Sequence, residues 1–87
     1  MFATLLDIRP KHISVGAFFD RFGVHKYPIL ASTDPGVQAL IKDCTVRSFI
    51  DLSRPDLPLG LGIITTAGFA IDTDAILTNP IQEYERP

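Results

Sequence analysis

The sequence lacks the pair of cysteines that a disulfide bond within the chain would need. Its single cysteine, Cys44, cannot form a disulfide within the chain, which excludes a disulfide-bonded secreted scaffold. An 87-residue chain also has a marginal core, because a domain of this size buries only about 60–65% of its unfolded surface. We therefore expect its stability to be completed by a partner or by self-association, with a homo-oligomer as one form.

Long hydrophobic runs are absent as well. The longest uncharged run, Leu57 to Ile71, is interrupted by Pro58, Gly60, Gly62 and two threonines, and it is too short to span a bilayer. The segment from Met1 to Ile13 holds several large apolar side chains, but Asp7 interrupts them and no basic region precedes them. We therefore expect neither a signal peptide nor a membrane partner.

Clustered positive charge is the third absence. The sequence has eight Lys and Arg residues and ten Asp and Glu residues, which gives a net charge of −2. The basic residues are scattered along the chain. A protein that tracks a phosphate backbone needs a basic patch, so nucleic-acid binding is disfavoured. What remains is a globular composition, 46% hydrophobic and 21% charged, with the length of one domain.

The first helical pattern lies between Ser14 and Gly23. Its apolar residues fall at i, i+3, i+4 and i+7: Val15, Phe18, Phe19 and Phe22. Ser14 suits an N-cap, and Gly23 sits where a left-handed residue ends a helix. An aromatic stripe at helical spacing is typical of core, and an exposed aromatic binding face is the alternative.

The second and clearest pattern predicts a helix from Asp34 to about Ser48. Asp34 suits the N-cap and Pro35 the first helical position, and the apolar residues that follow repeat the helical spacing. Before it, Pro28 suits a short helical turn that runs through Ala31.

Residues 57–66 are ambiguous. Leu57, Leu61 and Ile64 line up on one helical face, whereas Pro58 and two glycines disfavour a helix. The run from Ile63 to Thr66 would also suit a strand. We favour a helix that ends at Gly68.

A final short helix follows. Asp72 or Thr73 caps it, and Asn79-Pro80 ends it. The fold class that results is all-α, a small bundle of three to five short helices in residues 14–79. Extended arms precede and follow this domain, at residues 1–13 and 80–87.

The sequence offers no set of groups for catalysis or for cofactor binding. Cys44 lies on the apolar face of its helix, which predicts a buried and inert thiol. His12 and His25 are too far apart for the usual metal-ligand spacing, and Asp72 and Asp74 are better explained as favourable charges at a helix N-terminus. We expect no catalytic residue, no cofactor and no metal. The pair of glycines at 60 and 62 lacks the third glycine of a dinucleotide fingerprint, so close packing explains it better.

Several short motifs follow one another along the chain in a distinctive order: Phe18-Phe19-Asp20-Arg21-Phe22, Ala31-Ser32-Thr33-Asp34-Pro35, Ile50-Asp51-Leu52, Pro55, Gly60-Leu61, Ala67-Gly68 and Ala75-Ile76-Leu77. This order resembles that of a group of short helical proteins encoded among the virion and tail genes of tailed bacteriophages. The resemblance covers about residues 14–77, and it implies a helical fold and a phage structural context.

Together these observations predict a non-catalytic structural or accessory virion protein, associated with the tail or the capsid. It would be made in the bacterial host cytoplasm and would bind other phage structural proteins. The alternative is a phage-encoded inhibitor that binds and blocks a host protein. The apolar residues of the two arms are the expected partner contacts: Phe2, Leu5, Leu6, Ile81 and Tyr84.

Overall fold

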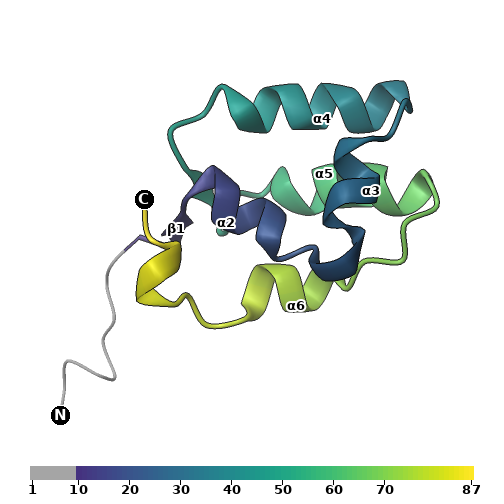
Figure 1. Cartoon of the computed structure of the whole chain (residues 1–87). Helices are drawn as coiled ribbons and strands as arrows, with labels where there is room; N and C mark the ends of the chain where they lie inside the picture. The colour runs from purple at the N-terminus through teal and green to yellow at the C-terminus, as the bar shows by residue number, and fades with distance from the viewer. Residues whose placement is uncertain (1–9) are drawn as a thin grey trace, which may run out of the picture.

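A computed structural model describes residues 10–87, and it is mainly helical. The predicted contacts Phe2, Leu5 and Leu6 lie outside the described residues. In order, the elements are β1 (His12–Ile13), α2 (Val15–Asp20), the 3-10 turn η1 (Gly23–His25), α3 (Lys26–Leu30), α4 (Pro35–Thr45), β2 (Ile50–Asp51), α5 (Leu57–Thr66), α6 (Thr73–Thr78) and the 3-10 turn η2 (Glu83–Glu85). Figure 1 shows α4 above α2 and α3, with α6 on the far side of these two helices.

Three of the helices begin at the side-chain caps that the sequence predicted. The Ser14 hydroxyl accepts a hydrogen bond from the Ala17 N–H at 3.1 Å, which caps α2. Asp34 caps α4 in the same way, and the carboxylate of Asp72 accepts from the N–H three residues later to cap α6. Asp72, not Thr73, is therefore the cap that the sequence left open.

The ends of the helices follow local backbone chemistry. Gly23 and Gly68 have φ angles of +61° and +106°, the left-handed region that only glycine enters without strain. Gly68 ends α5, whereas Gly23 follows the end of α2 and is the first residue of η1. Helix α4 ends at Thr45, three residues earlier than predicted, because β-branched Thr45 and Val46 weaken its last turn.

Residues 57–66 form the helix α5, as favoured, and the alternative strand from Ile63 to Thr66 is wrong. Pro58 lies in the first turn, where its missing N–H leaves no hydrogen bond unmade. A Cβ on Gly60 would lie 2.9 Å from Leu40 Cδ1, so this glycine lets α4 and α5 pack closely. The same explanation is wrong for Gly62, around which a Cβ would meet nothing within 4 Å.

The all-α description needs one correction. Strands β1 and β2 form an antiparallel pair in which His12 faces Asp51 and Ile13 faces Ile50. Two residues are too few to show the alternating pattern of a strand, so the sequence gives no sign of this pair. The pair ties the residues before α2 to the loop after α4.

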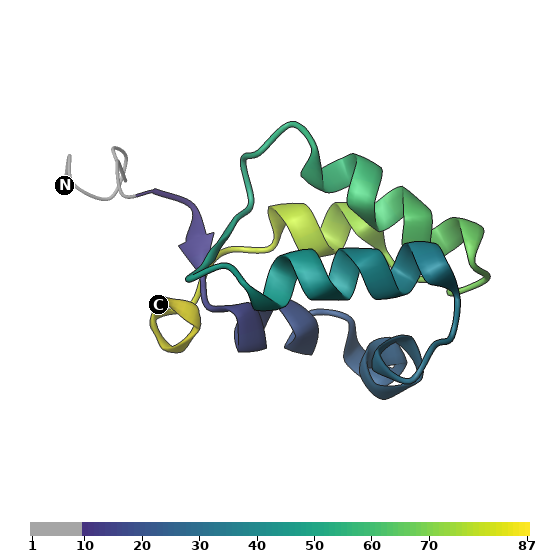
Figure 2. The ribbon, with the colours of Figure 1, turned by 90° about the horizontal axis from the view of Figure 1, so that it is seen from above.

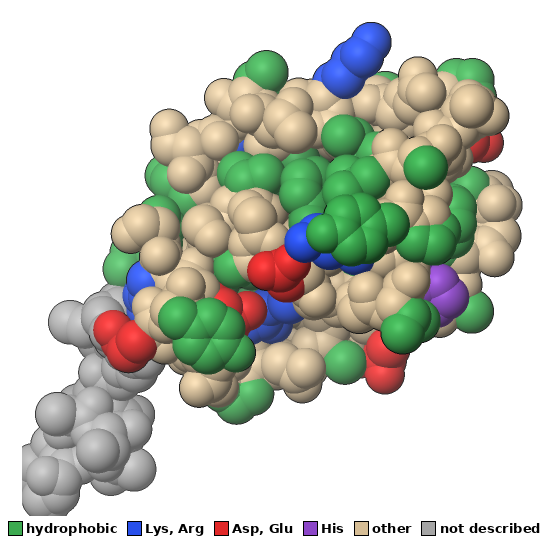
Figure 3. Space-filling view, viewed as in Figure 1, with side chains coloured by type: hydrophobic (Ala, Val, Ile, Leu, Met, Phe, Trp, Pro, Cys, Tyr) green, Lys and Arg blue, Asp and Glu red, His purple; other side chains and the backbone are tan. Residues whose placement is uncertain are grey.

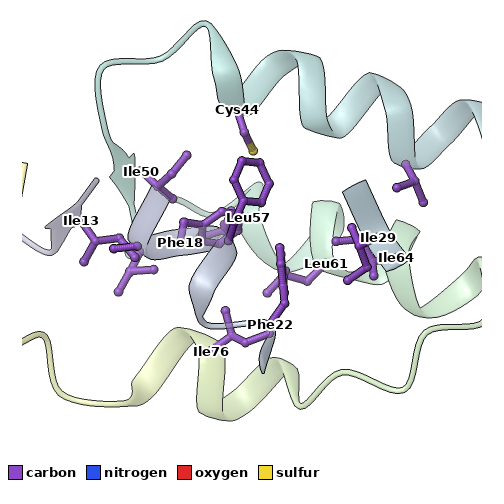
Figure 4. Packing of buried hydrophobic residues seen from close by; sticks show 14 residues of the cluster. Ile13, Phe18, Phe22, Ile29, Cys44, Ile50, Leu57, Leu61, Ile64 and Ile76 are labelled. Carbon is purple, nitrogen blue, oxygen red and sulfur yellow. The ribbon is translucent and has the colours of Figure 1, made fainter. Parts of the chain in front are cut away.

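The predicted aromatic stripe is buried. Phe18, Phe19 and Phe22 expose 8% of their surface or less, and the rings of Phe18 and Phe22 meet edge to face at 5.2 Å. Figure 4 shows Phe18 and Phe22 among buried side chains from the surrounding elements, including Leu61 of α5 and Ile76 of α6. The stripe is therefore the centre of the core and not a binding face.

Residues 80–87, which we call the C-terminal turn, do not form the extended arm that the sequence predicted. They fold back so that η2 lies beside β1, as both views show (Figures 1 and 2). The N–H of Ser14 donates to the carbonyl of Glu85 at 2.7 Å. The absence of an apolar helix face in this segment suggested a tail, but charged side chains hold it in place.

Candidate functional site

A groove opens between α4, β2 and α5, with a volume of about 460 Å³. Its floor is apolar, since Leu40 and Cys44 of α4 meet Leu57 and Gly60 of α5 there. We call it the α4–β2–α5 groove. Its lining is completed by His12, Asp43, Arg47, Ser48, Phe49, Ile50, Asp51, Arg54 and Asp56.

An aromatic pair forms one wall of this groove. The rings of His12 and Phe49 stack with their centroids 3.9 Å apart and their planes 17° from parallel. Phe49 remains 38% exposed. The β1–β2 pair places these two side chains together, because His12 lies in β1 and Phe49 directly precedes β2. The groove therefore offers a flat aromatic surface beside its apolar floor.

The charges on the rim are compensated within the molecule. Arg47 pairs with Asp43 one helical turn away, with both hydrogen bonds at 3.2 Å, and Arg54 pairs with Asp56 at 3.0 and 2.9 Å. The hydrogen bond from Arg54 holds the pKa of the Asp56 carboxyl below its ordinary value.

Asp51 is compensated in a different way. Its carboxylate accepts hydrogen bonds from the hydroxyl and the N–H of Ser53, which lower its pKa, and it lies 3.7 Å from His12 Nε2. Each rim carboxylate thus already has a donor or a cation, and the groove is close to electrically neutral.

Cys44 and His12 share this groove, which the sequence did not indicate. The thiol is 2% exposed, and burial raises its pKa to about 11, with a further rise from Asp43. The protonated thiol is a poor nucleophile and a poor metal ligand. The prediction of a buried cysteine is confirmed.

The other residues that the sequence offered as metal ligands either have structural roles or lie in different elements. Asp72 caps α6, and His25 lies in η1, a different element from His12 in β1. Within residues 10–87, there is no group of three or more His, Cys, Asp or Glu side chains that could hold a metal ion.

A buried ion pair fixes the C-terminal turn. The guanidinium of Arg21 donates to both carboxylate oxygens of Glu85, at 2.8 and 2.9 Å, and these two side chains are only 7% and 9% exposed. Arg21 also donates to the carbonyls of Ile76 and Asn79 at the end of α6, at 2.7 and 3.2 Å. One side chain thus ties α2 to α6 and to the C-terminal turn.

Glu85 also organises the backbone of the turn itself. Its carboxylate accepts from the N–H of Gln82 at 2.9 Å, as one half of a capping box. The hydrogen bond from Arg21 is the main cause that holds the pKa of Glu85 below its ordinary value of 4.5. Arg86 completes the attachment by donating to the carbonyl of Pro10 at 2.8 Å.

The two C-terminal residues predicted as partner contacts differ in their exposure. Tyr84 projects from η2 and is 85% exposed, whereas Ile81 is half-buried and packs against the core. Tyr84 is therefore the one of the two that presents its side chain fully to solvent.

Further apolar side chains are exposed elsewhere. On α5 they are Leu59, 74% exposed, and Ile63, 41% exposed, which we call the α5 outer face. Val24 and Tyr27 are exposed in the η1–α3 segment. Figure 3 shows another band of hydrophobic side chains between α4 and the α2–α3 segment.

Comparison with known proteins gave no relative: no family model, no curated protein and no solved structure matches this chain. Among residues 10–87, no helix has the length and apolar character needed to cross a bilayer.

Proposed function

We propose that this protein is a non-catalytic binding module that acts through protein–protein contacts. Its most distinctive feature is an exposed tyrosine on a turn that a buried ion pair holds against the rest of the protein. Tyr84 lies between Glu83 and Glu85, and Glu85 is locked to Arg21 by two short hydrogen bonds. This arrangement carries the proposal.

An aromatic side chain on an ordered turn is an efficient contact. Tyrosine combines a large apolar ring with a hydroxyl and has few torsions to restrain, and anchors of this type dominate many interfaces. Because the ion pair and the capping box already order the turn, a partner that covers Tyr84 would not have to order the backbone beneath it.

We further propose that the partner is another structural protein of a phage particle, in the tail or the capsid. The support is the motif order described above, which resembles that of small phage virion proteins. Arg21, the arginine of the first motif, is the residue that fixes the C-terminal turn. The protein would be made in the bacterial host cytoplasm and would end in the virion.

Mass spectrometry of purified virions tests this proposal. We expect the protein at a defined copy number per particle, and we expect Tyr84→Ala to reduce its incorporation. Val24→Ala is the matched control, because Val24 is equally exposed, at 89%, in a different element. Absence from virions, with expression early in infection, would favour the alternative of a host inhibitor.

A further inference from the structure

We propose that the C-terminal turn is exchangeable between copies of this chain, so that residues 80–87 of one copy occupy the place of the same residues in a second copy. The product is a dimer with two exchanged turns. This inference goes beyond the proposed function, because its partner is a second copy and not another protein. The residues that receive the turn are Pro10, Ser14 and Arg21, which we call the turn seat.

The turn seat holds the turn by a small set of directed contacts. The Ser14 N–H donates to the carbonyl of Glu85 at 2.7 Å, and Arg21 donates to the carboxylate of the same residue at 2.8 and 2.9 Å. Arg86 donates to the carbonyl of Pro10 at 2.8 Å. A guanidinium that holds both oxygens of a carboxylate is selective for charge and for shape. The occupant that fits this seat is therefore visible in the structure, and every copy of the chain carries it.

The turn has local structure of its own, which does not involve the seat. The N–H of Gln82 donates to the carboxylate of Glu85 at 2.9 Å, and the N–H of Glu85 donates to the carbonyl of Gln82 at 2.9 Å. These hydrogen bonds of the capping box lie entirely within residues 80–87. They are the same whichever copy supplies the seat, so the turn can be transferred as a unit.

The connection between α6 and the turn is short and weakly held. Helix α6 ends at Thr78, and residues 79–81 separate it from the capping box. Asn79 has left the helical conformation, with φ −58° and ψ 138°. Arg21 donates to the carbonyls of Asn79 and Pro80 at 3.2 and 3.5 Å, which are longer than its hydrogen bonds to the carboxylate of the turn. Changes in a few backbone torsions at this connection therefore move the turn off its own seat.

The turn covers a strand edge. The carbonyl of Lys11 accepts from the N–H of Leu52 on the side of β2. Backbone groups alternate between the two edges of a strand, so those of Pro10 and Ser14 that bind the turn point to the other edge of β1. A strand edge without a cover tends to pair with another chain. Release of the turn thus creates a site that the turn of a second copy fills.

The position of the turn seat lets two copies meet there. Both views place β1 and η2 together at one end of the molecule (Figures 1 and 2). Two copies that approach through this end bring each turn to the seat of the other. A reciprocal exchange uses the same surface on both copies, so it closes at a dimer and does not continue into a filament.

The exchange conserves the contacts of the closed protomer. Each copy gives up one turn and receives an identical one, so the ion pair, the cover of β1 and the packing of Ile81 against the core are all restored. The entropy of association is what differs. A turn tethered to its own seat has an effective concentration on the order of millimolar. The wild type should therefore be a protomer at micromolar concentrations and form dimers in the millimolar range.

Complementation between two full-length variants tests the proposal. Glu85→Gln has an intact seat and a weakened turn, since glutamine keeps the capping box and loses the charge. Arg21→Gln has an intact turn and a weakened seat. Each variant alone lacks the ion pair in every arrangement, so each should sediment as a protomer of 9.6 kDa. Their mixture should form a 1:1 heterodimer, in which the turn of Arg21→Gln occupies the seat of Glu85→Gln.

Hydrogen exchange shows whether the heterodimer uses the turn seat. With only the Glu85→Gln chain isotope-labelled, added unlabelled Arg21→Gln should slow exchange at the Ser14 N–H by about tenfold. The double variant Arg21→Gln/Glu85→Gln is the matched control, because its turn lacks the carboxylate, and it should leave the rate unchanged. If Arg21→Gln fails to give the wild-type circular dichroism, a synthetic peptide of residues 80–87 replaces it, with the Glu85→Gln peptide as control.

The inference is wrong if the wild type shows no dimer at millimolar concentration, if the mixture stays as two protomers, or if the double variant slows the exchange as well. Tyr84→Ala should exchange turns as the wild type does, since Tyr84 is 85% exposed. A loss of virion incorporation in that variant therefore bears on the proposed function alone, and a failed complementation bears on the exchange alone.

Discussion

The core and the C-terminal turn of this protein are held by opposite kinds of interaction. The core is a cluster of hydrophobic side chains, with Phe18 and Leu61 fully buried at its centre. The C-terminal turn depends on the charged pair between Arg21 and Glu85. Apolar burial is insensitive to pH and spread over many contacts, whereas the turn depends on two side chains. The difference indicates that the core is stable by itself, whereas the C-terminal turn stays attached only while the pair between Arg21 and Glu85 is intact.

The largest effect that this comparison predicts is in the core. Leu61 is 0% exposed, so Leu61→Ala should lower the free energy of unfolding by about 2–5 kcal/mol, through lost burial and a residual cavity. Urea unfolding at low protein concentration measures it. Leu59→Ala on the same helix should change stability by less than about 0.5 kcal/mol, because Leu59 is exposed. Equal losses at the two positions would contradict the assignment of the core.

The second prediction concerns the attachment of the turn. Glu85→Gln removes the charge that Arg21 binds and leaves buried donors poorly satisfied, which costs about 1–3 kcal/mol. Because the turn can detach while the core stays folded, we expect local release in place of global unfolding. Faster hydrogen exchange at the Ser14 N–H, which donates to the carbonyl of Glu85, would report it.

Glu83→Gln is the control for this prediction. Glu83 lies in the same turn with its side chain 75% exposed, 3.8 Å from Arg86, and exposed pairs contribute little. Its substitution should leave the exchange rate of the Ser14 N–H close to that of the wild type. A Glu85→Gln variant whose core and turn unfold together would show that the two regions are one cooperative unit.

The third prediction compares two helix caps. Asp34→Ala and Asp72→Ala each remove a side-chain acceptor from a helix N-terminus, at a cost of about 0.5–2 kcal/mol. The helix α6 is short and lies against Arg21, so loss of its cap should also loosen the C-terminal turn. Thermal unfolding by circular dichroism measures the stability, and exchange at the Ser14 N–H measures the turn. Asp34→Ala should leave that exchange unchanged.

The helices were predictable because their signals are local. The spacing of Phe18 and Phe22, the cap at Asp34 and the stop at Gly68 each depend on residues within a few positions along the chain. Even α5 was recoverable, since its proline falls in the first turn, where a helix tolerates it.

The contacts between distant segments were not predictable. Arg21 and Glu85 are separated by 64 positions, and nothing local distinguishes this pair from the exposed pairs on the surface. The pairing of Ile13 with Ile50 involves two residues on each side, too few for a pattern. The groove depends on this pairing, because it brings His12 to Phe49 and Cys44. Sequence reasoning therefore named Tyr84 as a partner contact, which stays a prediction, and it missed both the groove and the ion pair that holds the turn.

The smallest expected effect is the pH dependence of the attachment of the C-terminal turn. It compares the turn directly with the core, because only the turn should respond to acid. Arg21 lowers the pKa of Glu85 in the folded turn below its ordinary value of 4.5, so the carboxylate stabilises attachment above that value. This contribution is lost as the pH falls through the lowered pKa, because a protonated Glu85 binds Arg21 weakly. The core keeps its apolar contacts over the same range.

Exchange at the Ser14 N–H should consequently rise in acid, relative to that of buried amides in α5, and this rise should be absent in Glu85→Gln. Asp56→Asn is the matched control: the pKa of Asp56 is also lowered by an arginine, but that pair lies on the exposed groove rim, so the acid response of the Ser14 N–H should persist. If Asp56→Asn abolished that response and Glu85→Gln preserved it, the titrating group would lie at the groove, and the assignment of the acid response to the pair of Arg21 and Glu85 would be wrong.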